Sequence, residues 1–184
     1  RREFGSIIEV SVDVGGGGEV AVTQPFLNLL HRNAVCQKKA GAAMTQIVEA
    51  DRTQTVFLQQ LRELLGNEKS MHDWEHSVRV CKTALRLCRT ENGDEDIVAL
   101  AALLHDCDDY KVFGPENAAK LTNARRILDE SGADGKTAAA VLEIVSNLGY
   151  SKYLSGMQKL DRNGHIVQDA DMLDAMGAVG IVRT

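Results

Sequence analysis

The chain has 184 residues, a formal net charge of -5 and an aromatic content of 4%. This length suits one ordinary domain with an apolar core. A mildly acidic chain without a dense basic block argues against a nucleic-acid polymer or a membrane surface as the partner, although a few cations suffice to hold a nucleotide. No apolar run approaches the roughly 20 residues of a membrane span.

The four cysteines show no C-x-x-C spacing. Cys81 and Cys88 lie in a helical pattern beside apolar residues, which favours buried and reduced thiols. The basic start of the chain soon turns acidic and glycine-rich, unlike a signal peptide. We therefore expect a reducing, cytoplasmic location.

The beginning of the chain differs in pattern from the rest. Residues 8–14 alternate between apolar and polar side chains at the period of a strand, and four glycines separate them from a second short apolar run, "EVAVT". A short hairpin and a flexible segment both fit, because successive glycines fix no turn geometry. We expect an irregular or flexible leader over residues 1–43 and one domain over residues 44–184, whose C-terminal end could be truncated.

The remainder of the chain predicts a series of helices. Apolar residues repeat at helical spacing through "VFLQQLRELLG", where Gly66 is a common helix stop. Ser70 followed by Asp73 resembles a capping box and predicts the start of the next helix. Asp94 ends a turn as an N-cap, and further helices are predicted over residues 95–106, 117–131, 135–149 and 165–182. Helices joined by short links predict an all-α bundle.

Two histidines lie on apolar faces of these helices. His76 shares a stripe with Val80 and Ala84, and His105 follows Leu104 on the stripe of its own helix. For either histidine alone, a buried neutral ring with one hydrogen bond is the simpler interpretation. The neighbouring carboxylates favour a different interpretation of the two histidines.

These carboxylates lie on the same inward faces. Asp106 directly follows His105, and an unpaired buried charge would cost several kcal/mol. In the last helix, Asp171 and Asp174 share a face with apolar residues. The inward polar set is thus His76, His105, Asp106 and Asp171, with Asp174 close by. Two imidazoles and two carboxylates form a mixed nitrogen and oxygen site that suits one divalent cation, chosen from Mn, Ni, Fe, Co, Mg or Zn.

The order of these residues resembles a known family. "HDWEHSVRV", "AALLHDCDDYK" and "VQDADMLDAMGAVGIVRT" form the pattern H…HD…D, which is similar to the HD-domain superfamily of metal-dependent phosphohydrolases and to its small single-domain bacterial branch. The resemblance implies an all-α HD-type bundle and one divalent cation. It also implies hydrolysis of phosphoester or phosphoanhydride bonds by metal-activated water, with a nucleotide or another small phosphorylated metabolite as the substrate.

The resemblance also implies roles for neighbouring residues. Asp109 stands three positions after Asp106, where related enzymes carry an acid that handles the catalytic proton, although many of them have Glu there. Asp108 is the neighbouring alternative, and Asp106 counts as both catalytic and metal-binding. Lys111 and Arg79 are candidates for substrate binding, because the transition state of phosphoryl transfer carries negative charge.

The stretch "HDWEH" admits a second interpretation. His72 and His76 lie at positions i and i+4, as in the zinc-protease signature H-E-x-x-H, but Asp73 stands where that motif has Glu. The family pattern makes His76 the ligand and His72 a residue near the helix start that either faces the substrate or supports a ligand. A zinc protease is therefore the remote alternative. The nearer alternative is a non-catalytic module that binds a nucleotide or a metal for regulation.

Overall fold

The computed structural model describes residues 10–11, 21–22, 57–66, 73–156 and 158–176. The chain divides into two compact units, residues 1–54 and residues 55–184. In the first unit, strands β1 (Val10–Ser11) and β2 (Ala21–Val22) pair antiparallel, with Val10 opposite Val22. Met44 lies outside the described residues, so the expected division into a leader and a domain stays a prediction.

The described part of the second unit contains helices and no strand. These helices are residues 57–65, α3 (Trp74–Glu91), α4 (Glu95–Leu104), α5 (Tyr110–Lys120), α6 (Thr122–Glu130), α7 (Gly135–Asn147), α8 (Tyr150–Leu154) and α9 (Arg162–Met176). The prediction of an all-α bundle is confirmed. Within the described ranges, none of the helices combines the length and the apolar character that crossing a membrane requires.

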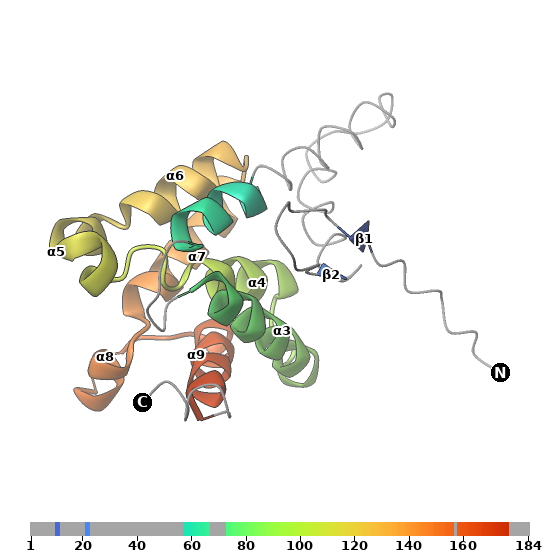
Figure 1. Ribbon diagram of the computed structural model, residues 1–184. Coiled ribbons are helices and arrows are strands. Elements are labelled where there is room, and N and C mark those ends of the chain that lie inside the picture. Colours follow the sequence, from blue (N-terminus) through green and yellow to red (C-terminus); the bar gives the residue numbers. More distant parts are fainter. Residues whose placement is uncertain (1–9, 12–20, 23–56, 67–72, 157, 177–184) are drawn as a thin grey trace. The chain divides into compact units, whose positions relative to one another are not determined.

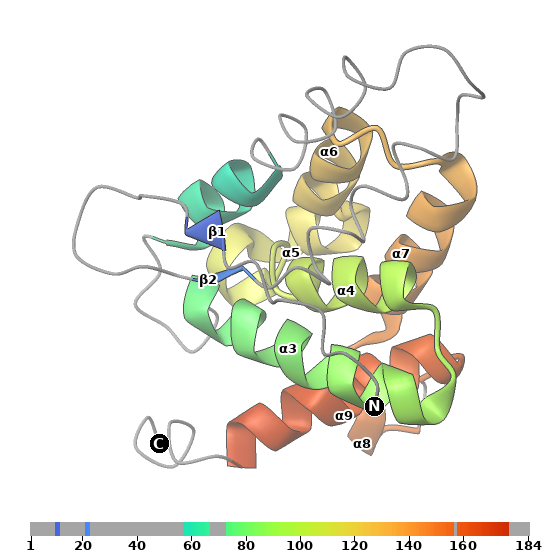
Figure 2. The same cartoon turned by 90° about the vertical axis from the view of Figure 1, so that its right-hand side faces the viewer.

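Helix α4 forms the centre of this unit. It contacts α3, α7 and α9, and every residue from Val98 to Leu104 is buried. A helix that is apolar on all sides is stable only when other elements cover it on all sides. Asp94 caps it as predicted, accepting hydrogen bonds from the backbone N–H groups of Asp96 and Ile97 at 3.0 and 3.2 Å. Figures 1 and 2 show α3, α4 and α9 side by side.

Helix α3 packs one long face against α4 and α9. Its buried residues are Trp74, His76, Ser77, Val80, Cys81, Ala84 and Cys88. The cap of this helix differs from the predicted one, since Asp73 accepts the backbone N–H of His76 at 2.8 Å and the helix begins directly after it. Ser70 lies outside the described residues. Cys81 and Cys88 are buried and free, as expected.

A close approach holds the start of α9 against the turn between α3 and α4. Oδ1 of Asn163 accepts the backbone N–H of Asp94 at 2.9 Å. A Cβ atom on Gly93 would lie 2.7 Å from Cδ1 of Ile166 and 2.9 Å from Sγ of Cys88, so the glycine leaves room for these buried side chains beside the turn. These contacts fix α9 beside α3, which is the arrangement that the site described below requires.

Helix α9 begins earlier than predicted. Oδ1 of Asp161 accepts the backbone N–H of Gly164 at 2.8 Å, so the helix starts at Arg162 rather than at the predicted residue 165. The described helix ends at Met176, and the predicted end at residue 182 lies outside the described residues.

The predicted helix over residues 117–131 is two helices. They meet at Leu121, which takes a left-handed conformation with φ of 51° and has no capping side chain of its own. Burial of the leucine side chain offsets a conformational cost of about 1 kcal/mol. Asp108 supplies the missing cap, because its two carboxylate oxygens accept the backbone N–H groups of Asn123 and Ala124, each at 2.9 Å.

The capping role of Asp108 predicts a loss of stability on mutation. Asp108→Asn should lower the free energy of unfolding by about 1.5 to 3 kcal/mol, because an amide has only one oxygen for two N–H donors. Urea denaturation followed by circular dichroism measures this change. Asp129→Asn, at an exposed position on α6, is the control and should leave the curve unchanged. Superimposable curves for Asp108→Asn and the wild type would contradict the capping role.

Candidate metal centre

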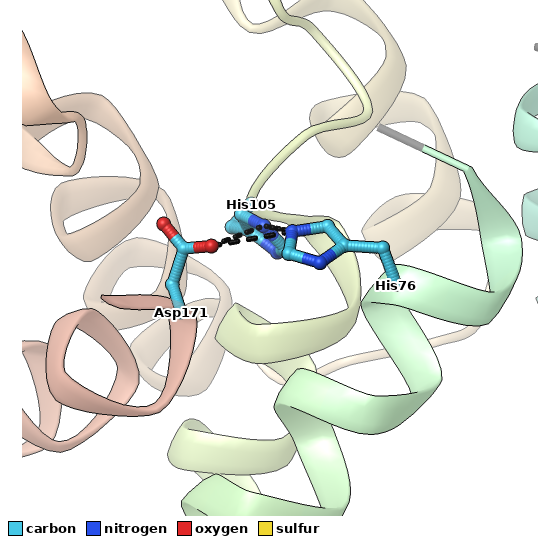
Figure 3. Close-up of side chains that lie close together, drawn as sticks. All are labelled: His76, His105 and Asp171. Carbon is cyan, nitrogen blue, oxygen red and sulfur yellow. Dashed lines mark hydrogen bonds and ion pairs between the residues drawn. The ribbon is translucent and has the colours of Figure 1, made fainter. Parts of the chain in front are cut away.

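Three helices bring the predicted ligands together. His76 lies in the first turn of α3, His105 directly follows the last residue of α4, and Asp171 lies on α9. In Figure 3 these three side chains converge, and their ligand atoms all lie within 4.8 Å of one another. Asp106, the residue after His105, completes the set of four that the sequence predicted.

The donor atoms of the four residues are closely packed. Nε2 of His76 lies 3.2 Å from Nε2 of His105 and 3.2 Å from Oδ1 of Asp171. Oδ2 of Asp106 lies 3.1 Å from Nε2 of His105 and 3.5 Å from Nε2 of His76. The His105 side chain is 5% exposed, whereas that of Asp171 is 40% exposed. The cluster is therefore buried at His105 and reachable by solvent at Asp171.

The outer nitrogen of each imidazole is committed to a hydrogen bond. Nδ1 of His105 lies 2.8 Å from the carbonyl oxygen of Ala102, and Nδ1 of His76 lies 2.8 Å from Oδ2 of Asp174. Both partners accept hydrogen bonds, so each Nδ1 carries the hydrogen and donates. In the neutral rings, both Nε2 atoms then present lone pairs to the centre of the cluster, which is the tautomer that a metal ligand needs.

The spacing of the donors fits one divalent cation. With bonds of about 2.1 Å, adjacent ligand atoms lie about 3.0 Å apart in an octahedral site and about 3.4 Å apart in a tetrahedral one. The distances around His76 and His105 run from 3.1 to 3.8 Å. The carboxylates of Asp106 and Asp171 supply two negative charges between two neutral imidazoles, which balances the charge of a divalent ion.

The carboxylates around His105 change the pKa of its imidazole ring. Burial by itself lowers the pKa of this ring, but the carboxylates of Asp106 and Asp171 and the hydrogen bond to Ala102 outweigh burial and raise the pKa to about 10. The cluster therefore stabilises a positive charge among its donor atoms, which either a proton or a metal ion can provide.

A second carboxylate on α9 lies behind His76. Arg79 donates from Nε to Oδ1 of Asp174 at 2.8 Å and from Nη2 to Oδ2 at 2.9 Å. Burial alone would raise the pKa of Asp174, but its hydrogen bonds with Arg79 and His76 hold the pKa below the usual value. The sequence suggested Arg79 for a phosphate contact. Two of its donors instead bind Asp174, and the phosphate contact stays a prediction.

The candidate proton carrier, Asp109, lies three residues past Asp106, in the segment between α4 and α5. The backbone N–H of Asp109 donates to the carbonyl oxygen of Asp106 at 3.1 Å. Asp109 is half-buried and caps α5, with Oδ1 accepting the backbone N–H of Lys111 at 2.8 Å. Asp108, the alternative from the sequence, caps α6 with both carboxylate oxygens, and its catalytic role stays a prediction.

The structure gives less evidence for the roles predicted for Lys111 and His72. The ammonium group of Lys111, an exposed residue, lies 5.8 Å from the ring centre of Tyr110, a cation–π contact. His72 lies outside the described residues. Asp73, which would be the base of a zinc protease, caps α3 instead, so the described residues give that alternative no support.

One residue of this site had no predicted role. Asp174 was noted in the sequence only as lying close to the ligands, yet it contacts both His76 and Arg79. The available signal was spacing, because His76 and Arg79 are three residues apart on one helix, as are Asp171 and Asp174 on another. Spacing alone does not say that the two helices are neighbours.

Comparison with protein families decides the classification. The HD domain model matches residues 73–176, which is more than half of the chain and includes all four candidate ligands. The chain belongs to the HD domain family. The chain is 34% identical over 127 residues to the uncharacterized protein YpgQ of Bacillus subtilis, in an alignment that covers 67% of this chain and 60% of YpgQ. The chain thus spans less than two thirds of that relative.

Solved structures of similar proteins share this fold. A crystal structure of a Lactobacillus plantarum protein is 31% identical, with a TM-score of 0.62 over 72% of this chain and 60% of that chain. YpgQ in complex with ADP is 34% identical, with a TM-score of 0.52 over 68% and 64%. An HD-superfamily hydrolase from Bacillus thuringiensis is 32% identical, with a TM-score of 0.53 over 73% and 63%.

The geometry of the cluster predicts the outcome of removing single donors. His105→Ala and Asp171→Ala should each lose the bound ion, because each removes one of four ligands. Elemental analysis of protein loaded with Mn²⁺ and then desalted measures the metal content. His165→Ala, which removes an exposed histidine on α9 that is not in the cluster, should keep it. Full retention of the ion in both ligand variants would exclude this site.

Proposed function

We propose that this HD domain chain is a metal-dependent hydrolase of phosphoester or phosphoanhydride bonds in nucleotides or other small phosphorylated metabolites. The observation that carries the proposal is the pair of Nε2 atoms, 3.2 Å apart, that face each other beside two carboxylates. Similarity to an HD-superfamily hydrolase supports hydrolysis as the reaction. The ADP in the YpgQ complex supports a nucleotide as the ligand.

The four proposed ligands supply two kinds of donor atom. His76 and His105 offer neutral nitrogens, and Asp106 and Asp171 supply the negative charge that retains a divalent cation. When bound, such a cation lowers the pKa of a water molecule and offsets negative charge on a phosphoryl group. Because Asp171 is the exposed ligand, the substrate approaches from its side of the cluster.

Asp109 is proposed to take the proton of the attacking water. In the reaction, the water oxygen bonds to phosphorus while the bond from phosphorus to the leaving group breaks. The carboxylate of Asp109, at the start of α5, is placed one turn past Asp106 and is the candidate that accepts the released proton. The exposed ammonium group of Lys111 is proposed to pair with a phosphate oxygen of the substrate.

A hydrolysis panel tests this function directly. Nucleoside mono-, di- and triphosphates and p-nitrophenyl phosphate esters are incubated with Mn, Ni, Co, Mg, Fe or Zn, and the released phosphate or phenol is measured. We expect metal-dependent turnover that a chelator abolishes, that Asp171→Ala loses and that His165→Ala retains. Binding of ADP without hydrolysis of any substrate under any metal would instead support the non-catalytic regulatory module.

The role of Asp109 can be separated from its capping role. Asp109→Asn should lower kcat by roughly 10²- to 10⁴-fold, the usual contribution of general acid–base catalysis, with metal content unchanged. Asparagine is about as good an N-cap as aspartate, so stability should be preserved. Asp134→Asn, the same substitution at the N-cap of α7, is the matched control and should leave kcat unchanged. Equal kcat values for the two variants would show that another group moves the proton.

A further inference from the structure

The carboxylate of Asp174 joins the metal centre to a cation on the neighbouring helix. Its Oδ2 accepts the Nδ1 hydrogen of His76 at 2.8 Å, and the guanidinium group of Arg79 binds both of its oxygens at 2.8 and 2.9 Å. The Asp174 side chain is 15% exposed, so these bonds are largely shielded from water. A two-bond contact with arginine fixes the plane of a carboxylate as well as its position.

Helix geometry pairs these residues one turn apart. His76 and Arg79 are at positions i and i+3 on α3, and Asp171 and Asp174 are at positions i and i+3 on α9. Residues three apart lie on one face of a helix, one above the other. Where α3 contacts α9, one turn of each helix therefore provides a ligand pair, His76 with Asp171, and a supporting pair, Arg79 with Asp174.

The charges explain why Asp174 supports the centre rather than binding the ion. The positive charge of Arg79 balances the negative charge of Asp174. The two carboxylates of the ligand set are left to balance a divalent cation. Asp174 also contacts the far side of the His76 ring, since it binds Nδ1 while the ligand set faces Nε2.

We propose that Asp174 is a positioning residue of the metal centre, which holds His76 in the tautomer with a lone pair on Nε2, and that Arg79 fixes Asp174 for this task. This inference rests on the proposed metal site. A ring without this acceptor could place its hydrogen on either nitrogen, and a hydrogen on Nε2 would block the bond to the ion. Partners of this kind typically contribute about 10- to 100-fold to metal affinity or activity.

Asp174→Asn is the sharpest substitution for testing this role. The amide keeps the size of the carboxylate but has one oxygen and one NH2 group. The amide oxygen takes the place of Oδ2, where it accepts from both Nδ1 of His76 and Nη2 of Arg79, but a neutral amide accepts more weakly than a carboxylate. On the other side of the ring, Nε2 still faces the carboxylates of Asp106 and Asp171, so the balance moves toward a hydrogen on Nε2. The variant should therefore shift the His76 hydrogen toward Nε2 without emptying the space that Asp174 fills.

Two measurements on the full chain test the inference. Titration calorimetry with Mn²⁺ should show affinity about 10- to 100-fold lower for Asp174→Asn than for the wild type. In the metal-free protein at mildly alkaline pH, ¹⁵N spectra of the imidazoles should place the His76 hydrogen on Nδ1 in the wild type and move it in the variant. Asp169→Asn, at an exposed position of the same helix, is the matched control and should change neither result.

A second variant covers the case in which Asp174→Asn does not fold. Arg79→Lys keeps the charge but loses the two-bond contact, so Mn²⁺ affinity should fall by less than in Asp174→Asn but measurably. Arg86→Lys, at an exposed position of the same helix, is its control and should bind Mn²⁺ like the wild type. Wild-type affinity in Arg79→Lys would overturn the role given to Arg79.

The possible results separate this inference from the proposed function. If the wild type binds Mn²⁺ and His105→Ala does not, but Asp174→Asn binds with wild-type affinity and an unchanged tautomer, the metal site stands and the inference fails. If the wild type binds no divalent ion, the proposed function fails. The spectra of the metal-free protein then still decide the inference, because an unchanged His76 tautomer in Asp174→Asn overturns it.

Discussion

The arrangement of this domain depends on two imidazole nitrogens that face each other at 3.2 Å. Each ring has already committed its Nδ1 hydrogen, His105 to the carbonyl of Ala102 and His76 to Asp174. Two neutral rings held in this way would bring lone pairs into contact, which is unfavourable unless a positive charge lies between them. The adjacent carboxylates of Asp106 and Asp171 are negatively charged and also favour a positive charge at this point. The cluster therefore suits a cation.

Packing between helices α3, α4 and α9 holds the side chains of the cluster in place. Helix α4 is buried on all sides, and this anchors His105 and Asp106 at its end. Helix α3 starts at the Asp73 cap, so His76 lies in its first turn. Helix α9 packs against α3 and α4, and its Asp171 lies 3.2 Å from Nε2 of His76 and 3.8 Å from Nε2 of His105.

Helical periodicity was sufficient to predict the bundle and the inward position of His76 and His105, because burial repeats along each helix. The sequence could not show features that depend on contacts between distant residues. The break at Leu121 is stable because Asp108 caps α6 from another loop, and no local pattern marks it. Asp174 meets Arg79 and His76 across separations of 95 and 98 residues, so its role became visible only once α3 and α9 were known to touch.

The most direct test of this account is a crystal structure of the protein grown with Mn²⁺, with anomalous diffraction used to locate the ion. The account predicts one strong peak within about 2.4 Å of Nε2 of His76, Nε2 of His105 and one oxygen each of Asp106 and Asp171. An ion bound elsewhere, or no ion between these four side chains at saturating Mn²⁺, would contradict it.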